Sequence, residues 1–307
     1  MSSMSKMRKR RGYIEFLYII PFLILVLIFS YYPLYGWIYS FFDYQPPLPF
    51  SWDSFVGLKW FKVLFQNKSF VNQTLEVLRN TFAMSGIALA FSWLPMFFAI
   101  FLNEIRHISF RKFVQTVTTL PNFISWVLVY SVAFLLMSNN GMFNSVAMDL
   151  GIIDRPIDFL KSNEHIWFKM WLWLTWKNLG WAAIMYIAAI SGIDAELYEA
   201  ARVDGASRLK IIRNITIPSL LPTFFVLLLL NISNILNNGM EQYFVFQNSW
   251  NREHIQVLDL YVYNLSTSKP PVYSVSTALS MLKSIVSLVL LFAANTFSKL
   301  VRKESII

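Results

Sequence analysis

The 307-residue sequence contains no cysteine and only three histidines. Without cysteine, the chain has no disulfide framework, zinc–thiolate site, iron–sulfur cluster or cysteine nucleophile. His107, His165 and His254 are far apart in the sequence and suggest no metal-binding cluster. A Gly-x-x-x-x-Gly-Lys-Ser/Thr phosphate-binding loop is absent as well. The chain is therefore not expected to hydrolyse ATP by that route.

Charged residues are also scarce, at 14% of the chain, whereas 56% of its residues are hydrophobic. The mean hydropathy of +0.49 is too high for a soluble domain of this size and indicates a membrane protein. The 28 phenylalanines and 11 tryptophans, beside only 10 glycines, argue against a disordered or low-complexity chain. The net charge of +9 fits either nucleic-acid binding or the basic inner face of a membrane protein, and the positions of the charges decide between them.

Six charge-poor stretches are long enough to cross a bilayer as helices, since about 20 residues span its hydrocarbon core. They cover residues 16–42, 80–103, 113–137, 168–190, 215–236 and 277–297. Continuous apolar runs such as Phe22–Phe29 exclude a β-barrel, whose strands alternate in polarity. The first stretch is longer than a signal-peptide core and lacks a small-residue cleavage pattern, so we expect a retained anchor. The prediction is an all-α membrane protein with six transmembrane helices.

Positive charges alternate between the segments that join these stretches. One side holds Lys6, Arg8, Lys9, Arg10, Arg11, Arg106, Arg111, Lys112, Arg202, Arg208, Lys210, Arg213, Lys299, Arg302 and Lys303. The other side has the longer segments 43–75, 138–167 and 237–276, in which positive charge is sparse. By the positive-inside rule, both termini are cytoplasmic and the long segments face outward. We expect a basic cytoplasmic N-terminus over 1–15, a transmembrane domain over 16–300 and a cytoplasmic tail over 301–307, without a role for nucleic acid.

The segment 192–218, between the fourth and fifth stretches, has the strongest local pattern. Asp194 is a candidate N-cap for a short helix, and Gly205 suits the positive-φ turn after it. A second, basic amphipathic run then leads into the fifth stretch, where Pro218 falls in the first turn. On these features alone, an interfacial amphipathic link is as plausible as a functional element.

The residues Glu199-Ala200-Ala201, followed by Gly205, Ile215 and Pro218, resemble the EAA motif of bacterial ABC importer permeases. Ile217 stands where that family has leucine. The resemblance covers most of the chain and is closest to the sugar permeases of the polysaccharide and complex-oligosaccharide branch. The supporting segments are Gly57–Phe61, Leu102–Arg106, Leu120–Val127, Trp176–Lys177, Gly180–Trp181 and Ala188–Asp194.

This resemblance implies a type I ABC importer (MetI-like) transmembrane fold in the bacterial plasma (inner) membrane, and an oligosaccharide as the substrate. It implies a second homologous permease, two copies of an ABC ATPase that bind ATP and magnesium, and an extracellular solute-binding lipoprotein. No cofactor is expected in this chain. The family also implies that the EAA segment docks in a cleft of the ATPase. The implied coupling residues are Glu199, Ala200, Ala201, Asp204, Gly205, Ile215 and Pro218.

A polar stripe marks a candidate substrate pathway. Asn231, Asn234, Asn238 and Glu241 follow one another at helical spacing and are predicted to share one helix face. Amides on such a face either bind sugar hydroxyls or join neighbouring helices. The same alternatives apply to the stripe Ser276, Ser280, Ser284 and Ser287, beside Lys283.

Three further residues are candidates for this pathway. Trp176 and Tyr243 either offer aromatic faces to sugar rings or belong to the aromatic side chains that meet the interface and lipid, which is the better explanation for most aromatics in this chain. Lys177, within the fourth stretch, either extends to the interface or meets an interior carboxylate or the substrate.

Two other classes of protein are alternatives. An integral membrane enzyme would need a polar centre, but Asp154, Asp158 and Glu164 have no histidine partner or metal-ligand spacing. An ion-coupled secondary transporter would be expected to have interior carboxylates and an inverted repeat, and the sequence has few of the former and no obvious repeat.

Overall fold

The computed structural model describes residues 15–270 and 272–302, and over these ranges the regular secondary structure is helical apart from an isolated antiparallel bridge between Phe42 and Phe55. It forms two compact units. The first unit comprises the described residues up to Lys68 together with Asn264–Leu282, and the second comprises Ser69–Tyr263 and the described residues from Lys283 onward. The predicted basic N-terminus and the end of the predicted tail (1–14 and 303–307) lie outside the described residues.

The first unit contains the predicted first span. Residues 15–26 are α-helical, and the helix continues as a π-helical turn, η1 (Leu27–Tyr31), and a 3-10 helix, η2 (Tyr32–Phe41), with a proline in its first turn. Together they form a candidate membrane span over Glu15–Phe41. Its large apolar side chains are exposed, as expected of a surface that meets lipid.

An aromatic cluster follows this span in the first unit. The Phe42 ring packs against Phe50, Trp52 and Phe55 with ring centroids 4.6, 5.4 and 5.2 Å away. Its backbone oxygen accepts hydrogen bonds from Trp60 Nε1 and from the Ser274 hydroxyl. The short helices η3 (Trp52–Ser54) and α2 (Lys59–Gln66) are folded around this cluster.

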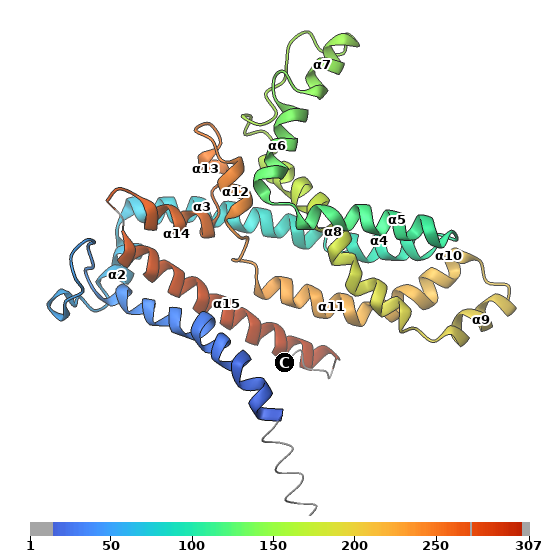
Figure 1. Cartoon of the computed structure of the whole chain (residues 1–307), viewed down its shortest axis with the longest axis horizontal. Coiled ribbons are helices and arrows are strands. Elements are labelled where there is room, and N and C mark those ends of the chain that lie inside the picture. The colour runs from blue at the N-terminus through green and yellow to red at the C-terminus, as the bar shows by residue number, and fades with distance from the viewer. Residues whose placement is uncertain (1–14, 271, 303–307) are drawn as a thin grey trace, which may run out of the picture. The chain divides into compact units, whose positions relative to one another are not determined.

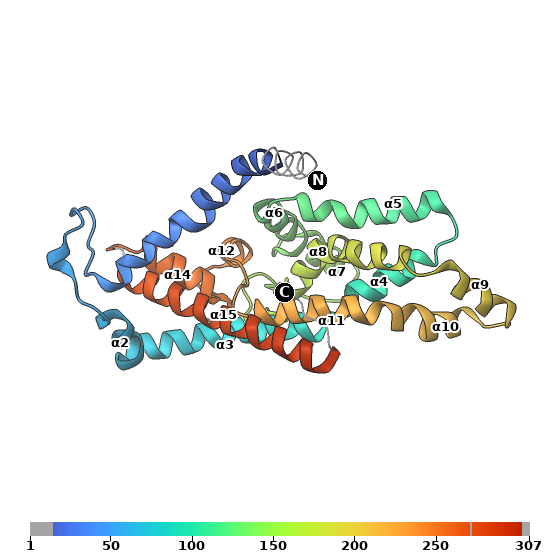
Figure 2. The same cartoon turned by 90° about the horizontal axis from the view of Figure 1, so that it is seen from below.

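Helices α3 to α13 and parts of α14 and α15 build the second unit (Figures 1 and 2). Their bounds are α3 (Lys68–Ala90), α4 (Leu94–Asn103), α5 (Ile108–Thr119), η4 (Leu120–Phe123), α6 (Trp126–Met137), α7 (Met142–Asp149), α8 (Ile166–Ser191), α9 (Ala195–Val203), α10 (Arg208–Ile211), η5 (Ile212–Thr216), α11 (Ile217–Ser233), α12 (Glu241–Phe246), α13 (Arg252–Ile255), α14 (Leu258–Thr267) and α15 (Tyr273–Arg302).

Five helical stretches in the described residues are long and apolar enough to cross a membrane. They are Glu15–Phe41, Lys68–Asn103, Trp126–Asp149, Arg208–Ser233 and Tyr273–Thr296. Helices α8 and α9 form a sixth if they are taken as one broken span, although they are bent by 71°. The predicted all-helical membrane architecture is confirmed, and the count of six depends on this pair.

The second span begins earlier than predicted. Residues 68–75, expected in an outer segment, belong to the first part of α3, which begins at Lys68. They are more polar than the rest of the span, so hydropathy alone did not include them. The helix is fixed from within the second unit, since Asn80 donates to the backbone oxygens of Glu253 and Gln256, and the Thr81 hydroxyl accepts from the Leu258 N–H.

The third predicted span, 113–137, is wrong as a single helix. Helix α5 ends at Thr119, and the chain passes through η4 before α6 begins at Trp126. Pro121 weakens the α-helix because it has no N–H to donate, and after the 3-10 turn η4 the backbone becomes extended at Ile124 and Ser125. Ser125 then caps the new helix by accepting a hydrogen bond from the Leu128 N–H.

Helix α8 lies at the centre of the second unit. Ile166 and Met170 belong to one hydrophobic cluster with residues of α3, α6, α12, α13 and α14, and Ala183 and Tyr186 belong to another with α4 and α11. Gly180 lets α8 approach α5 closely, because a Cβ there would lie 2.3 Å from the Thr118 backbone oxygen. Helix α8 is therefore a common support for the helices of the second unit that pack against it.

Candidate functional site

The segment 192–218, here called the coupling segment, leaves the end of α8 at a sharp angle. The Asp194 side chain accepts a hydrogen bond of 3.0 Å from the Glu196 N–H, which confirms the predicted N-cap of α9. Gly205 has φ +68°, which confirms the predicted positive-φ turn. The turn is closed by a hydrogen bond of 2.9 Å from the Ala206 N–H to the Ala201 oxygen.

Most of the predicted coupling residues lie on the surface of this segment. Glu199, Ala200, Asp204 and Gly205 are exposed, and Ala201 is half-buried. Apolar side chains are exposed beside them, with Val203 88% and Leu209 79% accessible. Exposed apolar groups among charged ones are typical of a protein-docking surface.

The coupling segment is continuous with α11. Helix α10 passes through the π-helical turn η5, which contains Ile215, into α11, where Pro218 lies in the first turn. The Tyr198 hydroxyl of α9 lies 3.2 Å from the hydroxyl of Thr216, which is 3% exposed. This hydrogen bond ties α9 to the base of α11.

A charged cleft of about 460 Å³ lies beside α9. Its lining combines α9, the start of α10 and the link after α4, and both views place these elements at the same end of the second unit (Figures 1 and 2). The charged side chains around it are Glu104, Arg106, Glu199, Arg202 and Arg208.

A polar cavity of about 640 Å³, here called the Lys177 cavity, forms where two helices are interrupted. One wall is the break between α5 and α6, and the other is the segment between α11 and α12. It brings together three of the residues predicted for the substrate pathway, Lys177, Asn238 and Glu241. Asn122, Asn178 and Gln242 also line it, which the sequence analysis did not predict.

Lys177 is 7% exposed, so its side chain is buried within the second unit. Its Nζ donates to the backbone oxygens of Pro121 at 3.2 Å and Asn122 at 2.6 Å, and it lies 5.6 Å from the centre of the Trp126 ring. The Pro121 oxygen also accepts from the Ile124 N–H, so Lys177 adds a second donor to it and one to the Asn122 oxygen at the break before α6.

The prediction that Asn231, Asn234, Asn238 and Glu241 share one helix face is wrong. Helix α11 ends at Ser233, and Glu241 begins the separate helix α12. Gly239, with φ +72°, lies in the non-helical segment between them. The Asn-Gly pair explains the turn just before α12, since both residue types favour turns and positive φ, whereas α11 has already ended at Ser233.

The asparagines consequently have different surroundings. Asn231 is not in the lining of the Lys177 cavity but lines a neighbouring cavity of about 460 Å³, which contains Trp171 and shares Asn178 with it. The Asn234 side chain donates to the Leu230 oxygen at the end of α11 and accepts from Asn237.

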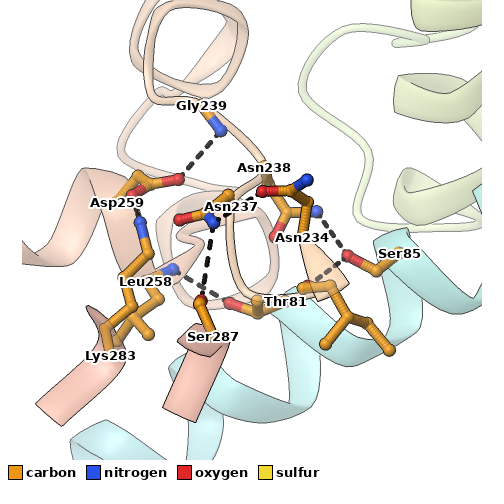
Figure 3. Close-up of polar contacts among 11 residues, drawn as sticks. Thr81, Ser85, Asn234, Asn237, Asn238, Gly239, Leu258, Asp259, Lys283 and Ser287 are labelled. Carbon is orange, nitrogen blue, oxygen red and sulfur yellow. Dashed lines mark hydrogen bonds and ion pairs between the residues drawn. The ribbon is translucent and has the colours of Figure 1, made fainter. Parts of the chain in front are cut away.

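Side chains from three other helices hold the non-helical segment (Figure 3). Asn238 donates to the Ser85 hydroxyl of α3 at 2.9 Å, and that hydroxyl donates to the Ile235 oxygen at 2.6 Å. The Gly239 N–H donates to Asp259 of α14 at 2.8 Å. Asn237 lies 3.5 Å from the Ser287 hydroxyl of α15, one of the predicted serine stripe, all of whose members fall within that helix.

The two aromatic candidates lie outside the lining of the Lys177 cavity. Trp176 lines an apolar cavity of about 250 Å³ and contacts Trp173 edge to face, with ring centroids 5.8 Å apart. Tyr243 is 2% exposed and belongs to the hydrophobic core. Burial raises the pKa of its hydroxyl, which therefore stays neutral at physiological pH. Tyr243 supports the site by packing.

The chain matches the family model described as "Binding-protein-dependent transport system inner membrane component" over residues 92–303. It is 36% identical over 295 residues to Protein LplB of Bacillus subtilis (strain 168), covering 95% of this chain and 90% of that protein. It is 38% identical over 295 residues to the polygalacturonan/rhamnogalacturonan transport system permease protein YteP of the same organism, covering 95% and 89% of the two chains.

Solved structures agree with the sequence comparisons. A chain of a bacterial ABC transporter involved in the import of the acidic polysaccharide alginate superposes with a TM-score of 0.82 at 31% identity, covering 95% of this chain and 97% of that chain. A chain of a bacterial alginate ABC transporter in complex with an alginate pentasaccharide-bound periplasmic protein gives 0.83 at 31% identity, covering 96% and 97%. The MetI-like fold of type I importer permeases is thereby confirmed.

Proposed function

The chain belongs to the family of binding-protein-dependent transport system inner membrane components and is a permease of sugar ABC importers, and we propose that it carries oligosaccharides. The names of its relatives support this substrate class, since they refer to polygalacturonan, rhamnogalacturonan and alginate. Family membership favours an ATP-driven importer over an ion-coupled transporter or a membrane enzyme.

The coupling segment supports the energy-coupling role most directly. An exposed helix, bent by 71° from α8 and joined through Thr216 to α11, suits a part that meets a partner and transmits its movement. Glu199 can accept hydrogen bonds from a basic group on that partner, and Ala200 allows close approach. We assign docking on a separate ATPase subunit to Glu199, Ala200, Ala201, Asp204 and Gly205, with Ile215 and Pro218 linking the segment to α11.

The Lys177 cavity is the proposed contribution of this chain to the sugar pathway. Asn122, Asn178 and Asn238 offer amide donors and acceptors, and Glu241 adds a carboxylate. Such groups match the hydroxyls of a sugar. Lys177 has a structural part in this proposal, since its hydrogen bonds to Pro121 and Asn122 hold the cavity wall.

The proposed assembly contains this chain, a second homologous permease, two copies of an ABC ATPase and an extracellular solute-binding lipoprotein. ATP and magnesium bind the ATPase subunits, and no cofactor binds this chain. We place the chain in the bacterial plasma (inner) membrane with six spans, cytoplasmic termini (1–15 and 301–307) and a transmembrane domain over 16–300, with the coupling segment in the cytoplasm. The description of the family as an inner membrane component supports this location.

The test is oligosaccharide uptake by vesicles that contain the whole transporter, with liganded binding protein outside and ATP inside. Glu199→Lys is expected to abolish uptake and to reduce the amount of ATPase subunit that copurifies. Glu164→Lys is the matched control, because it makes the same charge change at an exposed site between α7 and α8. Normal uptake and normal ATPase copurification with Glu199→Lys would refute the assignment.

A further inference from the structure

Asp259 holds the non-helical segment between α11 and α12 from outside the Lys177 cavity (Figure 3). One carboxylate oxygen accepts the hydrogen bond of 2.8 Å from the Gly239 N–H. The other forms an ion pair with Lys283 of α15. The Asp259 and Lys283 side chains are only 20% and 14% exposed, so solvent screens this pair weakly.

The residue that Asp259 binds lies in the cavity wall. Asn238, Gly239, Met240 and Glu241 are consecutive lining residues, whereas Asp259 is not among the lining residues. Gly239 lies in the non-helical segment between α11 and α12, so its N–H belongs to neither helix and needs an acceptor elsewhere. Asp259 provides that acceptor and fixes the direction in which the wall runs.

Lys283 explains why the acceptor is a carboxylate. It lies within the candidate span Tyr273–Thr296, where an unpaired ammonium group would be costly. The Asp259 carboxylate supplies the opposite charge, and a carboxylate oxygen accepts from a backbone N–H more strongly than a neutral amide oxygen does. The two side chains therefore act together on one backbone group.

We propose that Asp259 is a positioning residue for sugar passage, which orients the cavity wall at Asn238–Glu241 through the Gly239 N–H, with Lys283 as its counter-ion. The proposal rests on the proposed function for its transport role. Two double variants separate the acceptor from the charge. Asp259→Asn with Lys283→Met removes both charges but keeps an acceptor for Gly239, whereas Asp259→Ala with Lys283→Met removes the acceptor as well.

The measurement is uptake per assembled transporter, as a function of the concentration of liganded binding protein. The variant that retains the acceptor is expected to keep its maximal rate within about threefold of the wild type, and the variant without it to lose about tenfold or more. The binding-protein concentration at half-maximal uptake is expected to change by less than about twofold in both, because the residue acts on passage rather than on delivery. Equal maximal rates for the two double variants would overturn the proposal.

A labelling experiment tests the positioning without transport. The chain has no cysteine, so Glu241→Cys provides one reactive group in the cavity wall for a water-soluble maleimide. Loss of the acceptor is expected to change the labelling rate at least about fivefold, and the variant that retains it to label like its parent. Unchanged labelling in both would refute the positioning role. Absence of binding-protein-dependent uptake in the wild type would instead refute the proposed function, and the labelling result would still decide this inference.

Discussion

The two ends of α11 are built in opposite ways. Its N-terminal end continues an exposed segment, in which Val203 and Leu209 face solvent and one hydrogen bond, from Tyr198 to Thr216, joins it to α9. Its C-terminal end breaks into a non-helical segment that hydrogen bonds tie to Ser85 of α3 and Asp259 of α14. The coupling segment at the N-terminal end is free to meet another protein, although Leu220 of α11 itself is buried against α4 and α8. The C-terminal end is held by polar contacts within its own unit.

This difference indicates a division of work along one helix. A partner that moves the coupling segment acts on a surface with few internal contacts to break, so little of its energy is lost in local rearrangement. The tethered end keeps the wall of the Lys177 cavity in a defined place relative to α3 and α14. In a transporter, α11 would then carry a displacement from the energy source toward the substrate pathway.

The largest expected effect comes from Gly205→Glu, which tests whether the free end is the docking end. A side chain at φ +68° strains the turn by about 1 kcal/mol, and a carboxylate is placed on the docking surface. We expect uptake to be abolished and copurification of the ATPase to fall.

Gly151→Glu is the matched control for this substitution. Gly151 also has φ +68° and open space around its Cβ position, but it lies just after α7. The same strain there should leave copurification of the ATPase unchanged. If both substitutions abolished uptake with ATPase still bound, strain rather than docking would be the cause.

The next largest effect is expected from Gly180→Ala, which tests whether α8 is the rigid support for both ends of α11. The added Cβ would lie 2.3 Å from the Thr118 backbone oxygen, so α8 and α5 must move apart, at a cost of about 1–3 kcal/mol or more. We expect a severalfold lower yield of assembled transporter on size-exclusion chromatography. Gly86→Ala in α3, where nothing lies within 4 Å of the added Cβ, should assemble at least as well as the wild type.

A smaller effect is expected from Asn238→Ala, which tests the tethered end. The substitution removes the hydrogen bond to Ser85 and an amide from the Lys177 cavity, and uptake should fall about fivefold with assembly intact. Asn231→Ala, in the neighbouring cavity, is the comparison and should lower uptake less than about twofold. Equal losses of uptake from the two substitutions would support the original prediction that these asparagines line one pathway.

The same two ends differ in how much of them the sequence predicts. The Asp194 cap and the Gly205 turn depend on residues within a few positions of each other, and both predictions are confirmed. The EAA pattern has the same local character. Because this segment is exposed, no distant part of the chain competes for its backbone groups, and the local sequence alone determines the cap and the turn.

The C-terminal end of α11 was predicted wrongly because the sequence analysis assumed that one helix continues beyond Ser233 to Glu241. The Asn238-Gly239 pair is a local turn signal against one continuous helix through Glu241, although α11 already ends at Ser233, before the pair. Pro121 similarly marks the break that the single span 113–137 overlooked. No local signal, however, relates Gly239 to Asp259 or Asn238 to Ser85, since these partners are brought together only by folding.

The smallest expected effect is that of Tyr198→Phe, which tests how firmly α9 is joined to α11. Removing the hydroxyl deletes the contact with Thr216 without changing the ring or the docking surface, so ATPase copurification should be normal. Uptake per ATP hydrolysed should fall about threefold, the effect of one neutral hydrogen bond on coupling.

Thr216→Val removes the other partner of this hydrogen bond, and its buried hydroxyl makes a double-mutant cycle informative. If the bond transmits movement, the double variant should lose no more coupling than the more affected single variant. Additive losses in the ratio of sugar transported to ATP hydrolysed would mean that the two hydroxyls act separately. The free end of α11 would then be connected to α9 only through the backbone of α10 and η5.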